Sequence, residues 1–397
     1  MLKQLIFFSI ILCLSFNAQG GEWSGYIASE LRYFPQSPLS IDQYENVNIA
    51  LSAQPEYHHE WDNGDQYFRF VPFVRLDQHD SERSHFDIRE LTWLKAAKNW
   101  ELRLGIRKLF WGVTESQHLV DIINQTDLVD HPDTEEKLGQ PMINLALFRD
   151  WGTVNFFILP GFRERTFPGR KGRLFGGGIP IDMEQSRYES GAKEKHVDWA
   201  VRWQQMLGNW DIGLSHFSGT SRAPRLLPGT DERGRFVLIP YYEQIEQTGL
   251  DLQLTREDML WKLEMISRND QDGRFTALTG GFEYTFVGVF DTDASLGVLT
   301  EYQFDDRHDN AMTPFEDDLM LGMRLALNDA QSTELLAGAV FDLDSSARSY
   351  LVEASRRLGD SWKLSLDVYI YSDIPIDDLA YGFRHEDFVQ LELAWYF

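Results

Sequence analysis

A histidine and a serine stand two positions apart, at His216 and Ser218. A base beside a hydroxyl is the pairing used in nucleophilic catalysis, because the imidazole can accept the proton of the attacking oxygen. Gly219 follows the serine, and the sequence assigns no third residue that would orient the imidazole. Alternate positions from Trp210 onward lie on one face of a strand, and both side chains fall on this apolar face. A polar rim at the end of that strand is therefore the simpler interpretation.

The segment 112–138 concentrates histidines and carboxylates, which are the groups that bind divalent metals. Their spacing matches no defined metal site, and acidic runs are usually solvated surface. We therefore predict no metal and no other cofactor in this chain. The acidic loop 305–309 could attract divalent cations by charge alone. The metal candidates considered are His118, Asp121, Asp127, Asp130, His131, Asp133 and Glu135.

Composition excludes several classes of protein. The 397 residues include 37 Lys and Arg against 62 Asp and Glu, a formal net charge of -25. So acidic a chain argues against nucleic-acid binding, since phosphates require a basic face. The one cysteine, Cys13, excludes a disulfide scaffold and a cysteine-ligated metal cluster. Hydrophobic residues make up 43% and argue against disorder.

The N-terminus has the pattern of a cleaved signal peptide. Lys3 supplies a positive charge, 5–16 is an apolar run too short to span a bilayer, and small residues follow at 17–20. We predict a signal peptide over 1–20, cut after Ala18 or Gly20. Cys13 lies inside the apolar run, which argues against a lipoprotein.

Strict alternation of apolar and polar residues is the main pattern in 21–397. In the last ten residues, one face carries Val389, Leu391, Leu393, Trp395 and Phe397. Two-residue periodicity places such a set on one side of a sheet. Each run is about ten residues long, which is what a tilted strand needs to cross a bilayer. The gaps alternate between short turns and long loops, as in outer-membrane barrels.

The sequence therefore predicts an all-β protein, a single transmembrane antiparallel β-barrel of about 18 strands, with 16 as the fallback. The segments 85–97 and 139–149 are the weakest assignments. The predicted strands are 22–34, 44–60, 66–79, 85–97, 99–111, 139–149, 152–164, 195–206, 209–220, 242–255, 258–269, 273–286, 292–304, 315–328, 332–343, 347–358, 361–372 and 386–397.

Half of the 12 tryptophans lie next to the short turns. Tryptophan favours the membrane interface, because its ring is apolar while its N–H group stays hydrated. The six residues predict an aromatic girdle at the short-turn end. They are Trp61, Trp100, Trp151, Trp210, Trp261 and Trp362.

The C-terminal pattern from Val389 to Phe397 resembles the insertion signal of Gram-negative outer-membrane β-barrel proteins. The residues from Trp111 to Asp127 are similar to those of porin-like barrels of that group. This resemblance implies export to the outer membrane of a Gram-negative bacterium through the barrel-assembly machinery. It also implies contact with outer-membrane lipid and lipopolysaccharide. Neither motif indicates a solute or an oligomeric state.

The long gap 112–138 is predicted to hold a short amphipathic helix. Thr114 could cap it, with Glu115 near its start, and His118, Leu119, Ile122 and Ile123 recur at helical spacing. This insert could fold into the barrel as a constriction or cap it from outside. Inside, its acidic residues would face a basic cluster on the wall across a narrowed lumen. The predicted constriction residues are Arg69, Arg75, Arg103, Arg107, Glu115, His118, Asp121 and Asp127.

These features favour a non-enzymatic, porin-like channel for passive diffusion of small hydrophilic or charged solutes. One alternative is an exporter or hydrophobic-substrate channel partnered with an envelope transport system, which would use inward apolar residues such as Phe157, Leu159, Ile266 and Leu336. A less favoured alternative is a lipid hydrolase. The pair at 216 and 218 resembles the His-x-Ser arrangement of outer-membrane lipid hydrolases, although those enzymes place Asn where this chain has Gly219.

Overall fold

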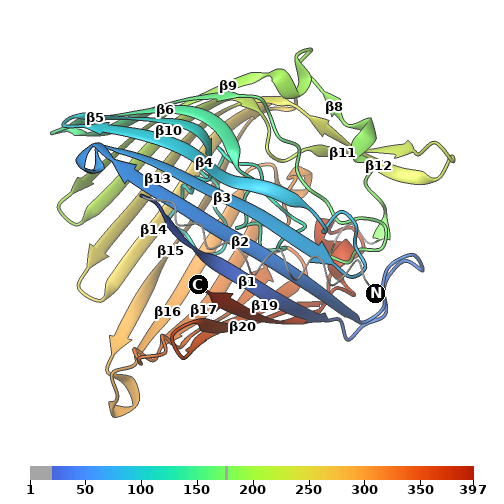
Figure 1. The fold of residues 1–397 in the computed structure, drawn as a ribbon. Helices are drawn as coiled ribbons and strands as arrows, with labels where there is room; N and C mark the ends of the chain where they lie inside the picture. Colours follow the sequence, from blue (N-terminus) through green and yellow to red (C-terminus); the bar gives the residue numbers. More distant parts are fainter. Residues whose placement is uncertain (1–19, 175–177) are drawn as a thin grey trace, which may run out of the picture.

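Eighteen strands form one closed antiparallel sheet in the computed structural model, which describes residues 20–174 and 178–397 (Figure 1). Strands neighbouring in the chain pair with each other around the ring, except that β8, β11 and β12 are left out of it. The ring closes where β1 pairs with β21. The predicted 18-strand barrel is therefore confirmed. The predicted signal peptide falls on residues 1–19, outside the described residues, and on Gly20.

Every predicted strand is present, with boundaries that differ by a few residues. The barrel strands are β1 (Glu22–Tyr33), β2 (Val47–Trp61), β3 (Gln66–Asp77), β4 (Phe86–Ala97), β5 (Trp100–Arg107), β6 (Gln140–Arg149), β7 (Gly152–Pro160), β9 (Val197–Leu207), β10 (Trp210–Thr220), β13 (Gln244–Arg256), β14 (Met259–Asp270), β15 (Gly273–Val287), β16 (Ser295–Asp305), β17 (Asp317–Ala326), β18 (Glu334–Asp342), β19 (Arg348–Leu358), β20 (Trp362–Ser372) and β21 (Phe388–Tyr396).

A small second sheet lies outside the ring, on the long loops between β7 and β13. It is built from β8 (Arg187–Tyr188), β11 (Arg225–Thr230) and β12 (Phe236–Tyr242), which project from one end of the barrel in Figure 1. Short 3-10 helices occur at η1 (Asp62–Gly64), η3 (Met183–Gln185), η4 (Lys193–Lys195), η5 (Val289–Asp291), η6 (His308–Asn310) and η7 (Leu379–Phe383). None of the helices in the described ranges is long and apolar enough to cross a membrane.

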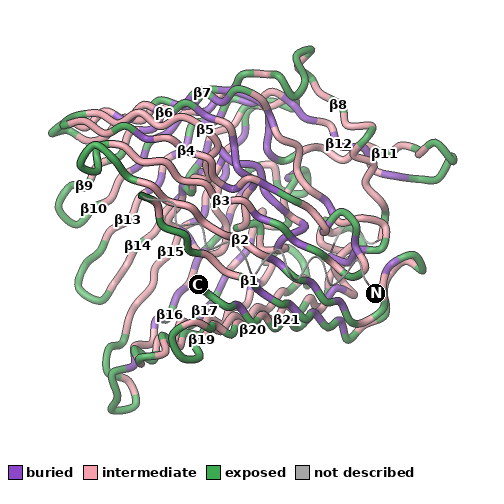
Figure 2. Tube along the Cα trace, viewed as in Figure 1, coloured by how far each residue is buried: buried purple, intermediate pink, exposed green. Residues whose placement is uncertain are grey.

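Alternation in the sequence becomes an inner and an outer face of the barrel. Figure 2 shows buried and exposed residues alternating along single strands such as β21. The residues of the predicted assembly signal face outward and stay exposed, from 36% at Val389 to 46% at Phe397. On the neighbouring strand β1, Glu30 and Arg32 point inward and are buried. Outward apolar and inward polar residues are the arrangement of a membrane barrel.

The two ends of the barrel differ. One end, here called the short-turn end, carries connections such as 98–99, 150–151 and 208–209, and the other, the long-loop end, carries 161–196 and 221–243. Trp151, Trp210, Trp261 and Trp362 lie beside short turns with 44–58% of their surface exposed. Trp61 is 36% exposed, and Trp100 is partly buried. The tryptophans predicted to form a girdle thus lie at the same end of the molecule.

The predicted helix in the insert 112–138 is wrong. The segment has turns and bends, with isolated bridges from Thr126 to Lys137 and from Asp127 to Thr166. Several of its backbone N–H groups bond to wall carboxylates, for example Val113 N to Glu264 Oε1 at 2.7 Å, and others bond to carbonyls within the segment without helical spacing, such as Asp127 N to the carbonyl of Glu136 at 2.8 Å. Isolated short helices are marginal in water, so these tertiary bonds decide the backbone conformation.

Candidate functional site

The insert folds into the lumen and fills one side of it. Val120, Ile122 and Ile123 are at most 4% exposed and pack with Trp111 against inward-facing residues of the wall. This contact buries apolar surface that would otherwise face water, which favours the inner position at about 25 cal/mol per Å². The wall residues of this cluster are Met142, Phe157, Leu159, Ala200, Phe217, Ile245, Ile266, Phe275 and Ala277, from β6 to β15.

Two buried wall carboxylates hold the first part of the insert. Glu264 on β14 is fully buried and accepts bonds from the N–H groups of Val113, Thr114 and Val120. Glu301 on β16 accepts the N–H groups of Glu115 and Ser116, both at 2.8 Å. Hydrogen bonds to ionised acceptors are stronger than neutral ones. The insert therefore reaches from the end of β5 across the lumen to the opposite wall.

A charged contact extends this anchorage to β17. Arg324 donates from Nη2 to Oε2 of Glu115 at 2.6 Å, and Lys262 Nζ lies 3.8 Å from the same oxygen. Arg324 remains 40% exposed, so this pair adjoins open space in the lumen. Glu115, one of the predicted constriction residues, thus lies opposite the strands from which the insert departs.

A β-bulge on β4 supplies the main contact on the near wall. The pairing of β3 with β4 shifts between Val71 and Pro72, which leaves Arg89 without a cross-strand partner. A bulge redirects a side chain, and here it turns Arg89 into the lumen. Its Nη2 lies 2.8 Å from Asp127 Oδ2 and 3.0 Å from Asp130 Oδ2, and its Nη1 donates to the carbonyl of Lys137.

Two more arginines complete a buried ionic network around the second part of the insert. Arg75 on β3 pairs with Glu30 at 2.6 Å and with Asp130 of the insert. Arg83 pairs with Glu30 and Asp77, both at 2.8 Å, and donates to the backbone of the insert at Val129. All five side chains are below 10% exposed. Of the predicted basic cluster, Arg75 is thus a residue that binds the insert directly.

The other three predicted arginines are held by the wall. Arg69 pairs with Glu56 at 2.8 Å and with Glu90 at 3.0 Å. Arg103 pairs with Glu101 on its own strand β5. Arg103 and Arg107 both donate to Asn144 Oδ1 on β6. These arginines are partly exposed to the lumen, but their charge is shared with wall acceptors.

The acidic insert residues predicted for the constriction are also paired with basic side chains of the protein. Asp121 lies 3.1 Å from Lys137 Nζ and accepts the N–H of Trp111. Asp127 pairs with Arg89, is fully buried and accepts the hydroxyl of Thr166. Burial alone would raise the pKa of Asp127, but its bonds to His85 and Arg89 hold that pKa well below the ordinary range.

His118 lies between a lumen wall and the end of the insert. Its Nδ1 is 3.9 Å from Glu264 Oε1, its Nε2 is 3.9 Å from Glu135 Oε1, and the ring of Phe110 packs edge-on against it. Burial disfavours its charged form, but the carboxylates of Glu135 and Glu264 prevail and raise the pKa of His118 to about 9. His118 is therefore positively charged at neutral pH.

The wall formed by β18 to β21 is less covered than the apolar side. Glu353 on β19 and Asp367 on β20 face inward and are half-buried, and Tyr369 donates to Glu353 at 2.6 Å. From the insert, His131 and Asp133 form a 2.7 Å pair, and His131 Nε2 lies 3.9 Å from Asp367 Oδ2. This wall, together with the insert, presents partly exposed carboxylates to the lumen.

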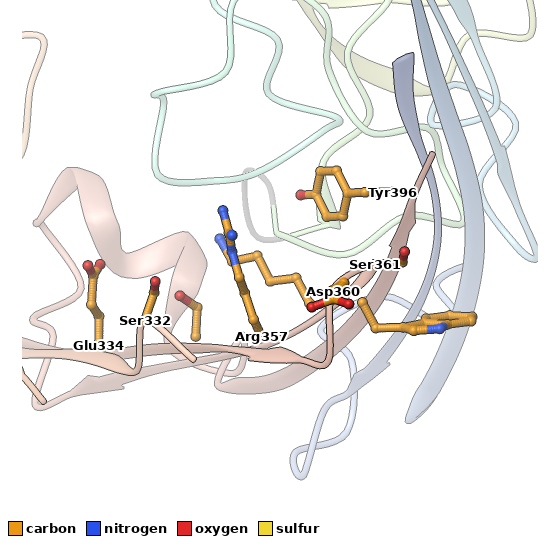
Figure 3. Close-up of a pocket in the computed structure, with 9 residues that line it drawn as sticks. Ser332, Glu334, Arg357, Asp360, Ser361 and Tyr396 are labelled. Carbon is orange, nitrogen blue, oxygen red and sulfur yellow. The ribbon is translucent and has the colours of Figure 1, made fainter. Parts of the chain in front are cut away.

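A pocket marks the short-turn end of the same wall. Figure 3 shows Glu334 and Arg357 rising from the same side of the sheet, with Tyr396 nearby. The register pairs Glu334 with Ser355, so both face inward, and Arg357 follows on that face. Lys363 lies opposite Arg357 on β20. Arg357 and Lys363 therefore line the short-turn mouth together with the carboxylates of Glu334 and Asp360.

The His216 and Ser218 pair lies on the outer face of β10, as its parity predicts. His216 Nδ1 is 3.0 Å from Thr248 Oγ1 on β13, and its ring packs on Trp199. The imidazole is therefore engaged across the strand pair rather than with the serine. The apolar residues considered for a hydrophobic path are also covered. Phe157, Leu159 and Ile266 lie beneath the insert, and Leu336 packs on the cluster of Leu299, Met320 and Val340.

Sequence reasoning missed Arg89 and Arg222 as anchors of the insert. Arg222, in the loop after β10, donates to the carbonyl of Ile123 at 2.9 Å and pairs with Asp198. Arg89 sits where strict alternation breaks, since Arg89 and Glu90 are adjacent charged residues in an otherwise alternating strand. This break in alternation is the sequence feature that could have identified Arg89 as a lumen-facing residue. Arg222 lies in a long loop and carries no comparable pattern.

Comparisons with known proteins support the fold. No protein-family model and no curated protein matches the chain. It is similar to the solved structure of Pseudomonas aeruginosa OccK11 (OpdR), with a TM-score of 0.52, 10% identity and 95% of each chain covered. It is also similar to a loop L8 deletion mutant of OmpT, an outer membrane protein of Vibrio cholerae. The TM-score is 0.48 and the identity 8%, with 95% of this chain and 99% of that chain covered. A mutant of Rh. blastica porin has a TM-score of 0.44 and 11% identity, with 95% of this chain and 100% of that chain covered. The likeness to OccK11 (OpdR), together with the closed ring of 18 strands, shows a porin-like barrel fold.

Proposed function

We propose that this protein is a porin-like channel of the outer membrane, through which small hydrophilic or charged solutes diffuse passively. The observation that carries the proposal is the division of the lumen. The insert packs an apolar face against β6 to β15, while the inward face of β18 to β21 keeps half-buried polar and charged groups. A barrel of 18 strands is wide enough to leave an aqueous path beside such an insert.

The aqueous path we propose runs between the insert and the wall of β18 to β21. Glu353, Asp367 and Asp133 border it midway, and Arg357 and Lys363 border it at the short-turn mouth. Charges between closely spaced walls of low dielectric act strongly on a passing ion. The excess of carboxylates midway favours cations, which is the selectivity we propose.

Export to the outer membrane by a cleaved signal peptide remains part of the proposal, as does assembly through the barrel-assembly machinery. The outward residues of β21 and the tryptophans at the short turns fit a surface in contact with lipid. Contact with lipopolysaccharide would follow at the long-loop end. The proposed channel has no enzymatic role.

Deletion of the insert tests the proposal. Replacing 114–136 by a short Gly/Ser bridge should raise single-channel conductance and weaken ion selectivity, because the lumen loses its filling and its charges. The matched control shortens the outer hairpin between β11 and β12, at 231–235, which lies outside the ring. The proposal fails if the insert deletion leaves the conductance of a correctly folded barrel unchanged, or if the intact barrel conducts no ions.

A further inference from the structure

Two leucines lie on the inner face of the wall that borders the proposed aqueous path. Leu336 on β18 and Leu351 on β19, here called the leucine pair, face inward and pack on the buried side chains of Leu299, Met320 and Val340. That contact covers one side of each leucine, and both remain only half-buried. Inward positions of a membrane barrel are usually polar, so the leucine pair requires an explanation.

The insert does not cover the leucine pair. It packs on the inward apolar residues from β6 to β15. Within the described ranges, the cluster that holds the leucine pair contains no residue of the insert. Phe315, from the loop between β16 and β17, is the side chain that joins this cluster from outside the strands. Part of the apolar surface of the leucine pair therefore faces the water of the path.

Two carboxylates lie beside the leucine pair. Glu353 is directly opposite Leu336 in the pairing of β18 with β19, and directly opposite Asp367 in the pairing of β19 with β20. Side chains directly opposite each other in a sheet are close enough to interact. Tyr369, which lies opposite Leu351, donates its hydroxyl to Glu353 at 2.6 Å and so orients that carboxylate. An apolar surface and two negative charges thus meet on three neighbouring strands.

The protein supplies little positive charge to these carboxylates. Among residues 20–174 and 178–397, Glu353 forms no ion pair within 4.0 Å with lysine, arginine or histidine. Asp367 lies 3.9 Å from His131 Nε2, but His131 is engaged by Asp133 at 2.7 Å. Partly desolvated carboxylates attract a mobile cation when no fixed cation neutralises them. The negative charge of this wall is therefore available to a solute.

We propose that the leucine pair, Glu353 and Asp367 form a binding site for organic cations that carry an ammonium group on a short apolar chain. The inference rests on the proposed channel function and names the class of solute that the channel prefers. In this binding mode the ammonium group lies beside the two carboxylates, and the apolar chain covers the leucine pair. An inorganic cation gains from the carboxylates alone, because it has no apolar surface to remove from water. The site thus selects among cations by their apolar part.

Block of the potassium current through single channels tests this inference. The probes are n-butylammonium and 3-hydroxypropylammonium, which have the same charge and nearly the same size but end in a methyl and a hydroxyl group. We expect n-butylammonium to give half-block at a concentration at least about fivefold lower, because the methyl group gains from burial while the hydroxyl loses its hydration. Pentanoate, which has a similar chain but a negative charge, should give no block. Its inactivity would exclude partition of the chain into lipid as the cause.

Variants locate the site. Leu336→Asn keeps the size of the side chain and should remove most of the difference between the two ammonium ions. Glu353→Gln should weaken the block by both ions several-fold, because both use the carboxylate. Leu227→Asn is the matched control, since Leu227 is a half-buried leucine on β11, outside the ring. It should leave the block by both ions unchanged. If Leu336→Asn fails to assemble, Leu351→Asn carries the test.

The outcomes separate this inference from the channel function on which it rests. Equal block by the two ammonium ions, in a barrel that conducts potassium, would refute the binding site and leave the proposed channel standing. A difference that persists in both Leu336→Asn and Leu351→Asn would refute the site as well. A correctly folded barrel that conducts no ions would overturn the channel function, and this inference with it.

Discussion

Arg89 of the wall and Asp127 of the insert form a buried ion pair, with 2.8 Å between Nη2 and Oδ2. The side chains are 1% and 0% exposed. The guanidinium also lies over the ring of Phe73, 4.4 Å from its centroid. Because a bulge aims Arg89 and an isolated bridge pairs Asp127 with Thr166, this ion pair joins the barrel wall to the insert.

Arg89→Met should loosen the insert. The substitution keeps the length and packing of the side chain but leaves the Asp127 carboxylate buried without its cation, at a cost of about 3–5 kcal/mol. Chemical denaturation of the barrel in lipid vesicles measures that loss. Channel recordings should show larger current fluctuations. The double variant with Asp127→Asn should recover most of the stability, because the uncompensated charge is gone.

Arg235→Met is the control for this experiment. Arg235 pairs with Asp231 at 2.7 Å but is 45% exposed, and a solvent-exposed ion pair contributes little to stability. If Arg89→Met costs no more than Arg235→Met, the buried pair does not hold the insert.

The pH dependence of stability should report on His118. Its folded pKa of about 9 lies above the ordinary value of 6.5. The stabilisation is therefore complete below about pH 6.5 and is lost as the pH rises through 9. At about 1.4 kcal/mol per pKa unit, it amounts to about 3–4 kcal/mol. His118→Asn should flatten the decline in unfolding free energy between pH 7 and 10. Identical slopes in the variant and the unmodified barrel would refute the role of this charge.

Ion selectivity should depend on the acidic wall. Glu353→Gln combined with Asp367→Asn should reduce the preference for cations, because both carboxylates face the proposed path. Reversal potentials in a salt gradient measure this change. Glu232→Gln is the control, since Glu232 is an exposed residue of the outer hairpin between β11 and β12, outside the ring. A reversal potential that does not respond to the double variant would place the path elsewhere.

Loss of the last residue should impair assembly. Phe397 donates its N–H to the carbonyl of Gly25 on β1 at 3.1 Å, and its ring packs on Trp395. Deleting Phe397 should therefore lower the fraction of heat-modifiable barrel recovered from outer membranes several-fold. Leu358→Ala, an exposed residue at the short-turn end of β19, serves as the comparison. Equal recovery of both variants would contradict a special role for the C-terminus.

The barrel could be predicted because its period is short and local. Side chains along each strand point alternately to lipid and to the lumen. The opposite faces of Leu391 and Glu392 can therefore be predicted without knowing which strands lie beside them. The weakest predicted segments, 85–97 and 139–149, proved to be β4 and β6. The bulge on β4 explains why the facing of the first was ambiguous.

The interior of the insert could not be predicted in the same way. The spacing of His118, Leu119, Ile122 and Ile123 suits a helix, yet the buried set is Val120, Ile122 and Ile123 in an irregular backbone. The partners that decide this conformation, Glu264 and Glu301, lie far along the chain on the opposite wall. Local periodicity carries no information about such distant partners.

The pairing of the first strand with the last has a consequence for the kinetics of folding. Tyr26 lies opposite Tyr396, and their rings pack 5.7 Å apart, so the closing contacts join residues separated by nearly the whole chain. Contacts of such high sequence separation form slowly, because loop entropy must be lost first. Until β21 has docked, both β1 and β20 present unpaired edges that invite pairing with other chains. The unfinished barrel is therefore the aggregation-prone species, and the rate of this last docking step should set the yield of folded protein.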